Sequence, residues 1–227
     1  MLAQLEEEES MRFLVDSADR AAVEEALAMG FVAGVTTNPT LMRRAGLRRS
    51  EIPQFVAAVR GYGAQEIHLQ TSGEARDQIL AEAEELYALD PERVFIKIPA
   101  TPAGFAAAAE LQRRAIPVTL TAVYTLRQVV VAQSVGAAYA AVYLGRMRDQ
   151  AIDAEGLVGQ MQAAIRAQGS SLQLLAASIR SASEIESLAL MGVASVTLPI
   201  AVLRSLLESE ATAQAASTFA ADAQTLV

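Results

Sequence analysis

Short runs of apolar and β-branched residues recur along the chain, and an amphipathic, alanine-rich segment follows each of them. The runs lack the strict polar alternation of a half-exposed sheet, so they predict parallel strands that are covered on both faces. They lie at Arg12–Asp16, Gly34–Asn38, Glu66–Thr71, Val94–Pro99, Pro117–Tyr124, Tyr139–Leu144, Leu172–Ser178 and Ser195–Ile200. Repeated β-then-α units of about 25 residues, without a linker, predict an α/β fold in the form of a single (β/α)8 barrel.

Helix start and stop signals lie between these runs. Asp19, Ser50 and Ser181 are candidate N-caps. Three glycines stand where helices are expected to end, namely Gly30, Gly136 and Gly192. A doubly wound open sheet is the alternative architecture, but the chain lacks the glycine-rich and Walker motifs that would favour it.

The two ends fall outside this repeat. Residues 1–10 are expected to form a disordered acidic extension, and residues 11–227 to form the barrel with an extra C-terminal helical segment at 203–227. The N-terminus has no apolar signal-peptide core. The apolar run at 129–145 is interrupted by Gln133 and Ser134 and is too short to span a bilayer. The sequence therefore predicts a cytoplasmic protein without a membrane partner.

Composition excludes several kinds of site. The chain of 227 residues carries a formal net charge of −8, which argues against a nucleic-acid partner but leaves room for a local basic pocket. It contains no cysteine, so disulfides, thiolate catalysis and cysteine-ligated metals are excluded. His68 is the single histidine, which excludes a multi-histidine metal site.

Polar residues collect at the predicted strand ends, where barrels of this kind place their catalytic groups. They are Asp16, Thr37, Asn38, Gln70, Lys97, Thr121, Tyr124, Tyr143, Arg146, Ser178 and Arg180. Lys97 lies inside the apolar run VFIKIP. Burial disfavours the charged form of a lysine and so provides a neutral amine, which can form an imine with a ketone or aldehyde. The alternative is a side chain that extends along the strand to solvent.

Six motifs of the chain resemble those of the transaldolase family. They are FLVDSA (13–18), GVTTNPT (34–40), IKIPATPAG (96–104), LTAVYT (120–125), LGR (144–146) and LAASIR (175–180). The resemblance extends from about Met11 to about Leu207 in family order. It implies a (β/α)8 barrel that acts through a lysine Schiff base without a metal or organic cofactor. It also implies sugar or sugar-phosphate substrates and a homo-oligomer, either a pentamer or a decamer.

Two positions favour one branch of that family. True transaldolases typically carry glutamate on the third strand and phenylalanine on the sixth, whereas this chain has Gln70 and Tyr143, similar to the small fructose-6-phosphate aldolase-like members. The implied reaction is the reversible cleavage of fructose 6-phosphate to dihydroxyacetone and glyceraldehyde 3-phosphate. The alternatives are a true transaldolase, which transfers a dihydroxyacetone unit between sugar phosphates, and a non-catalytic sugar-phosphate-binding or scaffold barrel.

The resemblance also implies the catalytic roles. Lys97 is the expected nucleophile. Tyr143, Gln70 and Thr121 are expected to hold the water that moves protons, and Asp16 to bind and orient substrate hydroxyls. A tyrosine hydroxyl can handle protons through such a water, so that the enamine left after cleavage is protonated and released. Phenylalanine would leave the enamine waiting for an acceptor aldehyde.

The expected substrate-binding residues are Asn38 and Thr37 for hydroxyl groups and Arg146, Ser178 and Arg180 for phosphate. The last two fall at the end of the seventh strand, where barrels often bind phosphate.

The chain departs from the family pattern at three positions. Ser17 replaces a threonine, Arg180 stands where lysine is common, and Arg148 lies near a position that is often acidic. We expect His68, two residues before Gln70, to be a core histidine rather than a general base.

Overall fold

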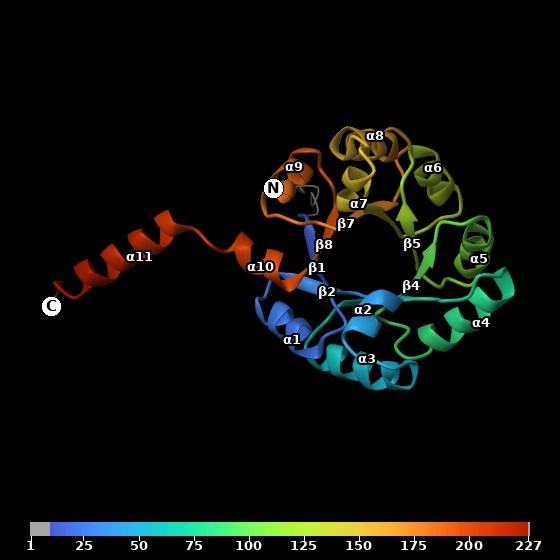
Figure 1. Ribbon diagram of the computed structural model, residues 1–227, viewed down its shortest axis with the longest axis horizontal. Coiled ribbons are helices and arrows are strands. Elements are labelled where there is room, and N and C mark those ends of the chain that lie inside the picture. The colour runs from blue at the N-terminus through green and yellow to red at the C-terminus, as the bar shows by residue number, and fades with distance from the viewer. Residues whose placement is uncertain (1–9, 227) are drawn as a thin grey trace, which may run out of the picture.

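Eight parallel strands close into a barrel in chain order in the computed structural model, which describes residues 10–226 (Figure 1). The strands are β1 (Arg12–Asp16), β2 (Val32–Thr36), β3 (Glu66–Gln70), β4 (Val94–Pro99), β5 (Val118–Val123), β6 (Tyr139–Tyr143), β7 (Gln173–Ala177) and β8 (Ser195–Leu198). Seven of the predicted runs contain their strand in full, and the run at 34–38 overlaps β2 at residues 34–36. Strand β8 pairs with β1 to complete the ring. The prediction of a single (β/α)8 barrel is confirmed.

Helices surround the barrel on its outer face, as Figure 1 shows, and one further helix leaves it. They are α1 (Arg20–Ala28), α2 (Pro39–Arg44), α3 (Ile52–Gly61), α4 (Arg76–Tyr87), α5 (Pro102–Arg113), α6 (Leu126–Ser134), α7 (Leu144–Asp149), α8 (Ala154–Ala167), α9 (Ser183–Leu190), α10 (Ile200–Leu206) and α11 (Glu210–Ala223). A short 3₁₀ turn at Arg49–Glu51 precedes α3. The extra C-terminal helix that the sequence predicts is α11.

The expected helix boundaries are partly confirmed. Asp19 caps α1, because its side chain accepts a hydrogen bond from the Ala22 amide at 3.0 Å. The three expected stop glycines all have φ between 69° and 82°, in the left-handed region that ends a helix. Ser50 is not an N-cap, since it lies within the 3₁₀ turn. Ser181 is not one either, because α9 begins later and the Glu184 carboxylate accepts the Arg180 amide instead.

Successive side chains along each strand alternate between the outer face of the barrel, which the helices cover, and its interior. On β4, Ile96 and Ile98 are fully buried against the outer helices, within the large apolar core between strands and helices. Phe95 belongs to a smaller group inside the barrel, and Lys97 lines the pocket at its mouth. The apolar run around Lys97 therefore reflects packing on the outer face, while the lysine points inward.

Strand β2 begins and ends two residues earlier than predicted, at Val32–Thr36 rather than Gly34–Asn38. Asn38 leaves the sheet because its side chain caps α2, accepting a hydrogen bond from the Leu41 amide at 3.0 Å. In the middle of β2, a Cβ on Gly34 would lie 2.3 Å from the Glu66 carbonyl oxygen, so only glycine allows β2 to approach β3 there. The pocket residues after β2 thus sit on a rigid strand-to-helix corner.

The C-terminal helix α11 extends away from the barrel (Figure 1), and all of its residues are exposed. Within residues 10–226, no helix is both long and apolar enough to cross a membrane. The expected disordered extension lies almost entirely outside the described residues, and the cytoplasmic location stays a prediction.

Candidate active site

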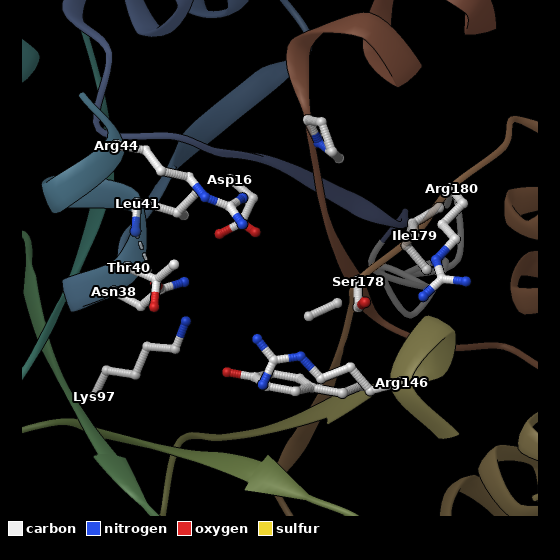
Figure 2. A pocket seen from close by; sticks show the side chains of 13 residues that line it. Asp16, Asn38, Thr40, Leu41, Arg44, Lys97, Arg146, Ser178, Ile179 and Arg180 are labelled. Atoms are coloured by element: carbon white, nitrogen blue, oxygen red, sulfur yellow. Dashed lines mark hydrogen bonds between the residues drawn. The ribbon is translucent and has the colours of Figure 1, made fainter. Parts of the chain in front are cut away.

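A pocket opens at the C-terminal ends of the barrel strands, where the sequence predicts the catalytic groups (Figure 2). It is lined by Asp16, Asn38, Thr40, Leu41, Arg44, Lys97, Tyr143, Arg146, Ala177, Ser178, Ile179, Arg180 and Pro199. Seven of these were expected from the sequence as site residues: Asp16, Asn38, Lys97, Tyr143, Arg146, Ser178 and Arg180. The barrel brings them together from strands that are far apart in the chain.

The Lys97 amine points into this pocket, as Figure 2 shows, although its side chain is only 2% exposed. Nζ donates a hydrogen bond to the Thr37 carbonyl oxygen at 3.2 Å. No ion pair recorded among residues 10–226 includes Lys97. The lysine therefore does not extend to bulk solvent, and the recorded partner of its amine is a neutral carbonyl oxygen.

Tyr143 and Thr121 form a buried pair of hydroxyl groups, with the Tyr143 Oη and Thr121 Oγ1 atoms 2.8 Å apart. A bulge in β5 follows Thr121, where Ala122 adopts a left-handed φ of 56° and the pairing with β6 shifts. On the other side, the Arg146 guanidinium lies 4.6 Å from the centre of the Tyr143 ring. These contacts fix the position of the Tyr143 hydroxyl at the pocket wall.

Asp16 and Asn38 present oriented polar groups to the same pocket. Thr36 donates a hydrogen bond to the Asp16 carboxylate at 2.8 Å and also contacts the Thr197 hydroxyl at 2.7 Å. The Asn38 side-chain oxygen is occupied by the Leu41 amide, so its NH₂ group is the part available to a ligand. The pair can accept from one substrate hydroxyl and donate to another.

Ser178 follows β7 in a left-handed conformation, with φ of 61°. Its carbonyl oxygen accepts a hydrogen bond from the Gly145 amide at 3.1 Å. A Cβ on Gly145 would lie 2.5 Å from that oxygen, so glycine is needed for the close approach of α7 to the end of β7. Strained non-glycine residues gather at functional sites, which fits the place of Ser178 in the pocket.

Arg180 and Arg148 are both engaged by carboxylates. The Arg180 guanidinium donates to both oxygens of Asp149, at 2.8 and 2.5 Å, and lowers the pKa of that carboxyl. Arg148 contacts Glu184 at 2.5 Å and also pairs with Glu155. Arg148 therefore serves an ion-pair cluster beside the pocket, and Arg180 reaches the pocket with its charge already balanced.

Three expected site residues lie outside the pocket lining. Thr121 contacts the pocket residue Tyr143 through its hydroxyl group and does not line the pocket itself. The Thr37 hydroxyl donates to the His68 carbonyl oxygen at 2.8 Å, so Thr37 offers Lys97 its backbone rather than its side chain. Gln70 lines a neighbouring hollow between β3 and β4, together with Pro39. These placements leave the expected roles of all three as predictions.

Arg44 lines the pocket but was not expected from the sequence. It lies on α2 together with Thr40, four residues earlier, and Leu41, three residues earlier, and all three face the pocket. The signal was present, since Asn38 followed by Pro39 is an N-cap followed by a favoured first helical residue. Within the helix that this cap predicts, Thr40 and Leu41 lie four and three residues before Arg44, so the three would share one helix face.

A buried polar network fills the barrel interior around His68. Its Nδ1 atom lies 2.8 Å from the Thr119 hydroxyl and its Nε2 atom 3.2 Å from the Glu66 carboxylate. Glu66 also accepts from the Tyr139 hydroxyl at 3.0 Å and pairs with Arg12 at 2.7 Å. The Glu66 carboxylate is thus balanced by the partly exposed Arg12, and the fully buried His68 is a core histidine, as predicted.

The network shifts the pKa of both titratable groups at its centre. Burial lowers the pKa of His68, and the charges of Lys97 and Arg12 add to this effect against the opposing Glu66 carboxylate. Burial alone would raise the pKa of Glu66, but the interactions with His68, Arg12 and Tyr139 outweigh it and lower the pKa. We conclude that His68 is neutral and Glu66 is charged near neutral pH.

Within residues 10–226, no three histidine, aspartate or glutamate side chains gather closely enough to hold a metal ion. The expectation that the protein uses no metal or organic cofactor stays a prediction.

Comparison with known proteins agrees with this geometry. The family model described as transaldolase/fructose-6-phosphate aldolase matches residues 13–227. The chain belongs to this family. A "Probable transaldolase" of Exiguobacterium sibiricum is 33% identical, covering 93% of this chain and 97% of that protein. A "Probable transaldolase 2" of Bacillus anthracis is 31% identical, with the same coverage of both chains.

Membership of the transaldolase/fructose-6-phosphate aldolase family makes the chain an enzyme of the class I aldolase or transaldolase type. A lysine Schiff base is typical of the family. Among solved structures, a mandelate oxidase mutant with a monooxide FMN adduct superposes with a TM-score of 0.61 at 16% identity. The match covers 83% of this chain and 64% of the oxidase, less than two thirds of its length, and it shows the shared fold alone.

The lowered pKa of His68 predicts how the single imidazole titrates. In the folded protein, its Hε1 proton resonance should keep the neutral position at pH 6.5, the usual pKa, whereas in urea it should titrate around that value. Between the folded pKa and about pH 6.5, only the unfolded chain takes up this proton, which favours unfolding. The free energy of unfolding should therefore be unaffected by His68 above about pH 6.5 and should decrease as the pH falls from there toward the folded pKa. An NMR titration checks the protonation of His68, and urea unfolding curves at each pH check the free energy of unfolding. Half-protonation of folded His68 at pH 6.5 would contradict the burial argument.

Proposed function

We propose that the protein is a class I aldolase that reversibly cleaves fructose 6-phosphate to dihydroxyacetone and glyceraldehyde 3-phosphate, with Lys97 as the imine-forming residue. The observation that carries the proposal is the Tyr143 hydroxyl, paired with Thr121 on the wall of the pocket that the Lys97 amine enters. Family membership supplies the reaction type, and the tyrosine favours the aldolase over the transferase.

The reaction runs through an imine at Lys97. Its neutral amine adds to the C2 carbonyl of the sugar phosphate, and loss of water gives a protonated imine. Removal of the C4 hydroxyl proton breaks the C3–C4 bond, and its electron pair moves into the imine as an enamine. Glyceraldehyde 3-phosphate departs at this point. Protonation of the enamine at C3 and hydrolysis of the resulting imine release dihydroxyacetone and restore the amine.

The proton steps are assigned to Tyr143 with Thr121 as its partner. A hydroxyl held 2.8 Å from a second hydroxyl can accept one proton while giving another, directly or through a bound water. Gln70 is proposed to complete the water site from the strand next to Lys97, since the two residues are paired in register between β3 and β4. The enamine can then be protonated without waiting for an aldehyde.

The substrate contacts follow the two walls of the pocket. Asp16 and Asn38 are proposed to orient hydroxyl groups near the reacting carbons, and Thr37 to support them through its backbone contact with Lys97. Arg146 and Ser178 are proposed to bind the phosphate group, and Arg180 to bind it only in competition with its ion-pair partner Asp149.

A true transaldolase is the second candidate, because the relatives from Bacillus and Exiguobacterium carry that name. Such an enzyme needs the same lysine and the same barrel, but it keeps the enamine until an acceptor aldehyde arrives. A non-catalytic sugar-phosphate-binding barrel would have no use for a buried amine at the pocket, and we set it third.

The two enzymatic candidates differ in their need for an acceptor. With fructose 6-phosphate alone, we expect steady release of glyceraldehyde 3-phosphate and free dihydroxyacetone. Tyr143→Phe should slow this release by about a hundredfold, because one proton-handling group is lost, while transfer to erythrose 4-phosphate is better preserved. Tyr87→Phe, on α4 and away from the pocket, is the matched control. Release that stops after about one turnover and resumes with erythrose 4-phosphate would make the wild-type protein a transaldolase.

We further propose that the protein forms a homo-oligomer, a pentamer or a decamer, in which α11 packs on a neighbouring copy. An isolated helix of this length is marginal in water, yet α11 extends from the barrel with the Phe219 side chain 70% exposed. A neighbouring copy would cover that aromatic side chain.

Deletion of residues 211–227 should shift the protein to smaller species in light scattering. Phe219→Ser tests the same contact without removing the helix, and Thr218→Ser serves as its control on the adjacent position. An unchanged mass for both the truncated protein and Phe219→Ser would remove the proposed role of α11.

A further inference from the structure

The pocket carries more positive charge than the substrate roles assigned so far require. Three arginine side chains line it beside the Lys97 amine, namely Arg44, Arg146 and Arg180, against the single carboxylate of Asp16. This local excess stands out in a chain with a net charge of −8. It indicates that the pocket selects an anionic ligand.

These four basic side chains are not equally free to bind an anion. Lys97 is reserved for the imine, and both terminal nitrogens of the Arg180 guanidinium are engaged by Asp149. Among residues 10–226, no hydrogen bond or ion pair is recorded for the Arg44 guanidinium, which is exposed at the pocket. An anion can therefore reach Arg44 without displacing a carboxylate, whereas at Arg180 it competes with Asp149.

The direction of the side chain agrees with this availability. Figure 2 shows Arg44 extending from α2 into the pocket on the side of Asp16, while Arg146 enters from α7 on the other side. Guanidinium groups that approach from two walls can each offer paired N–H donors to different oxygens of a phosphate. Thr40 and Leu41 line the pocket on the same helix and hold this face of α2 toward it.

We propose that Arg44 is the specificity-determining residue for the phosphate group of the substrate, acting with Arg146, and that Arg180 has the smaller role because Asp149 holds it. The proposal rests on the proposed function for its substrate class. It assigns to α2, next to the Asn38 cap, a part of phosphate recognition that the sequence places at the end of β7.

The kinetic test uses the reverse reaction with two acceptors that differ only in charge. With dihydroxyacetone as donor, the measured quantity is the ratio of kcat/KM for glyceraldehyde 3-phosphate to kcat/KM for glyceraldehyde. Arg44→Gln should lower this ratio by about tenfold or more, as expected for the loss of a charge-assisted contact. Arg180→Gln should lower it less. Arg43→Gln, the exposed neighbour outside the pocket lining, should keep the wild-type ratio.

Three outcomes overturn the proposal. An equal loss with both aldehydes in Arg44→Gln would mean that Arg44 orients Asp16 rather than binding phosphate. A larger fall of the ratio in Arg180→Gln than in Arg44→Gln would mean that the end of β7 contributes more to phosphate recognition than α2 does. A ratio for Arg44→Gln within twofold of that for Arg43→Gln would mean that Arg44 does not contribute to the preference for the phosphorylated aldehyde.

A binding measurement separates this proposal from the proposed reaction. Inorganic phosphate, titrated into the protein in a calorimeter, should bind Arg44→Gln about tenfold more weakly than wild type or Arg43→Gln. If neither aldehyde is turned over and yet this difference remains, the proposed reaction fails while the role of Arg44 stands. Equal phosphate affinity in all three proteins would overturn the role of Arg44 directly. Matching melting temperatures of the variants show that the fold is intact.

Discussion

The buried Lys97 amine is the feature on which the rest of the site depends. Placing an ammonium-bearing residue inside a barrel costs several kcal/mol when it is charged and without a partner, so the fold must either compensate it or favour the neutral amine. The structure provides a carbonyl acceptor, from Thr37, and no carboxylate partner among the described residues. Only an unprotonated amine attacks a ketone, and the Lys97 amine has a carbonyl rather than a carboxylate as its recorded partner.

The layer below the amine shows how the barrel supports this arrangement. Glu66, the negative charge of the interior, is shared by His68, Arg12 and Tyr139. It is therefore engaged away from Lys97. The His68 ring stacks on Phe95, with ring centres 4.9 Å apart, which fills the space beneath the lysine with rigid aromatic groups. The charged network around Glu66 thus lies deeper in the barrel than the Lys97 amine, which lies at the pocket.

Much of the fold could be predicted because strand periodicity and helix caps are local signals. Every predicted run overlaps a strand, and Lys97 was identified because one polar residue in an apolar run has few explanations. The period of two places Gln70 on the inner face but cannot say which of two neighbouring hollows it lines. The pairing of Arg180 with Asp149 joins residues 31 positions apart and leaves no mark in the sequence pattern.

Arg44 escaped prediction for a related reason. Its helix has six residues, too few to show a clear periodic pattern, and its arginine resembles the solvent-facing charges of any short helix. Only the closed barrel reveals that the corner after β2 turns this face toward the pocket. The nucleophile and the proposed anion site therefore differ in how well they can be predicted. The nucleophile is recognised from its local sequence, whereas the anion site depends on which charged residues pair in the folded chain.

The most direct test of the account is to trap the imine. The protein is incubated with dihydroxyacetone and reduced with borohydride, which converts an imine to a stable secondary amine, and the modified peptide is then mapped by mass spectrometry. The account predicts one reduced dihydroxyacetone unit per chain, on Lys97, and none in Lys97→Met. Modification of another amine, or none under conditions in which the wild-type protein turns over its substrate, would contradict the account.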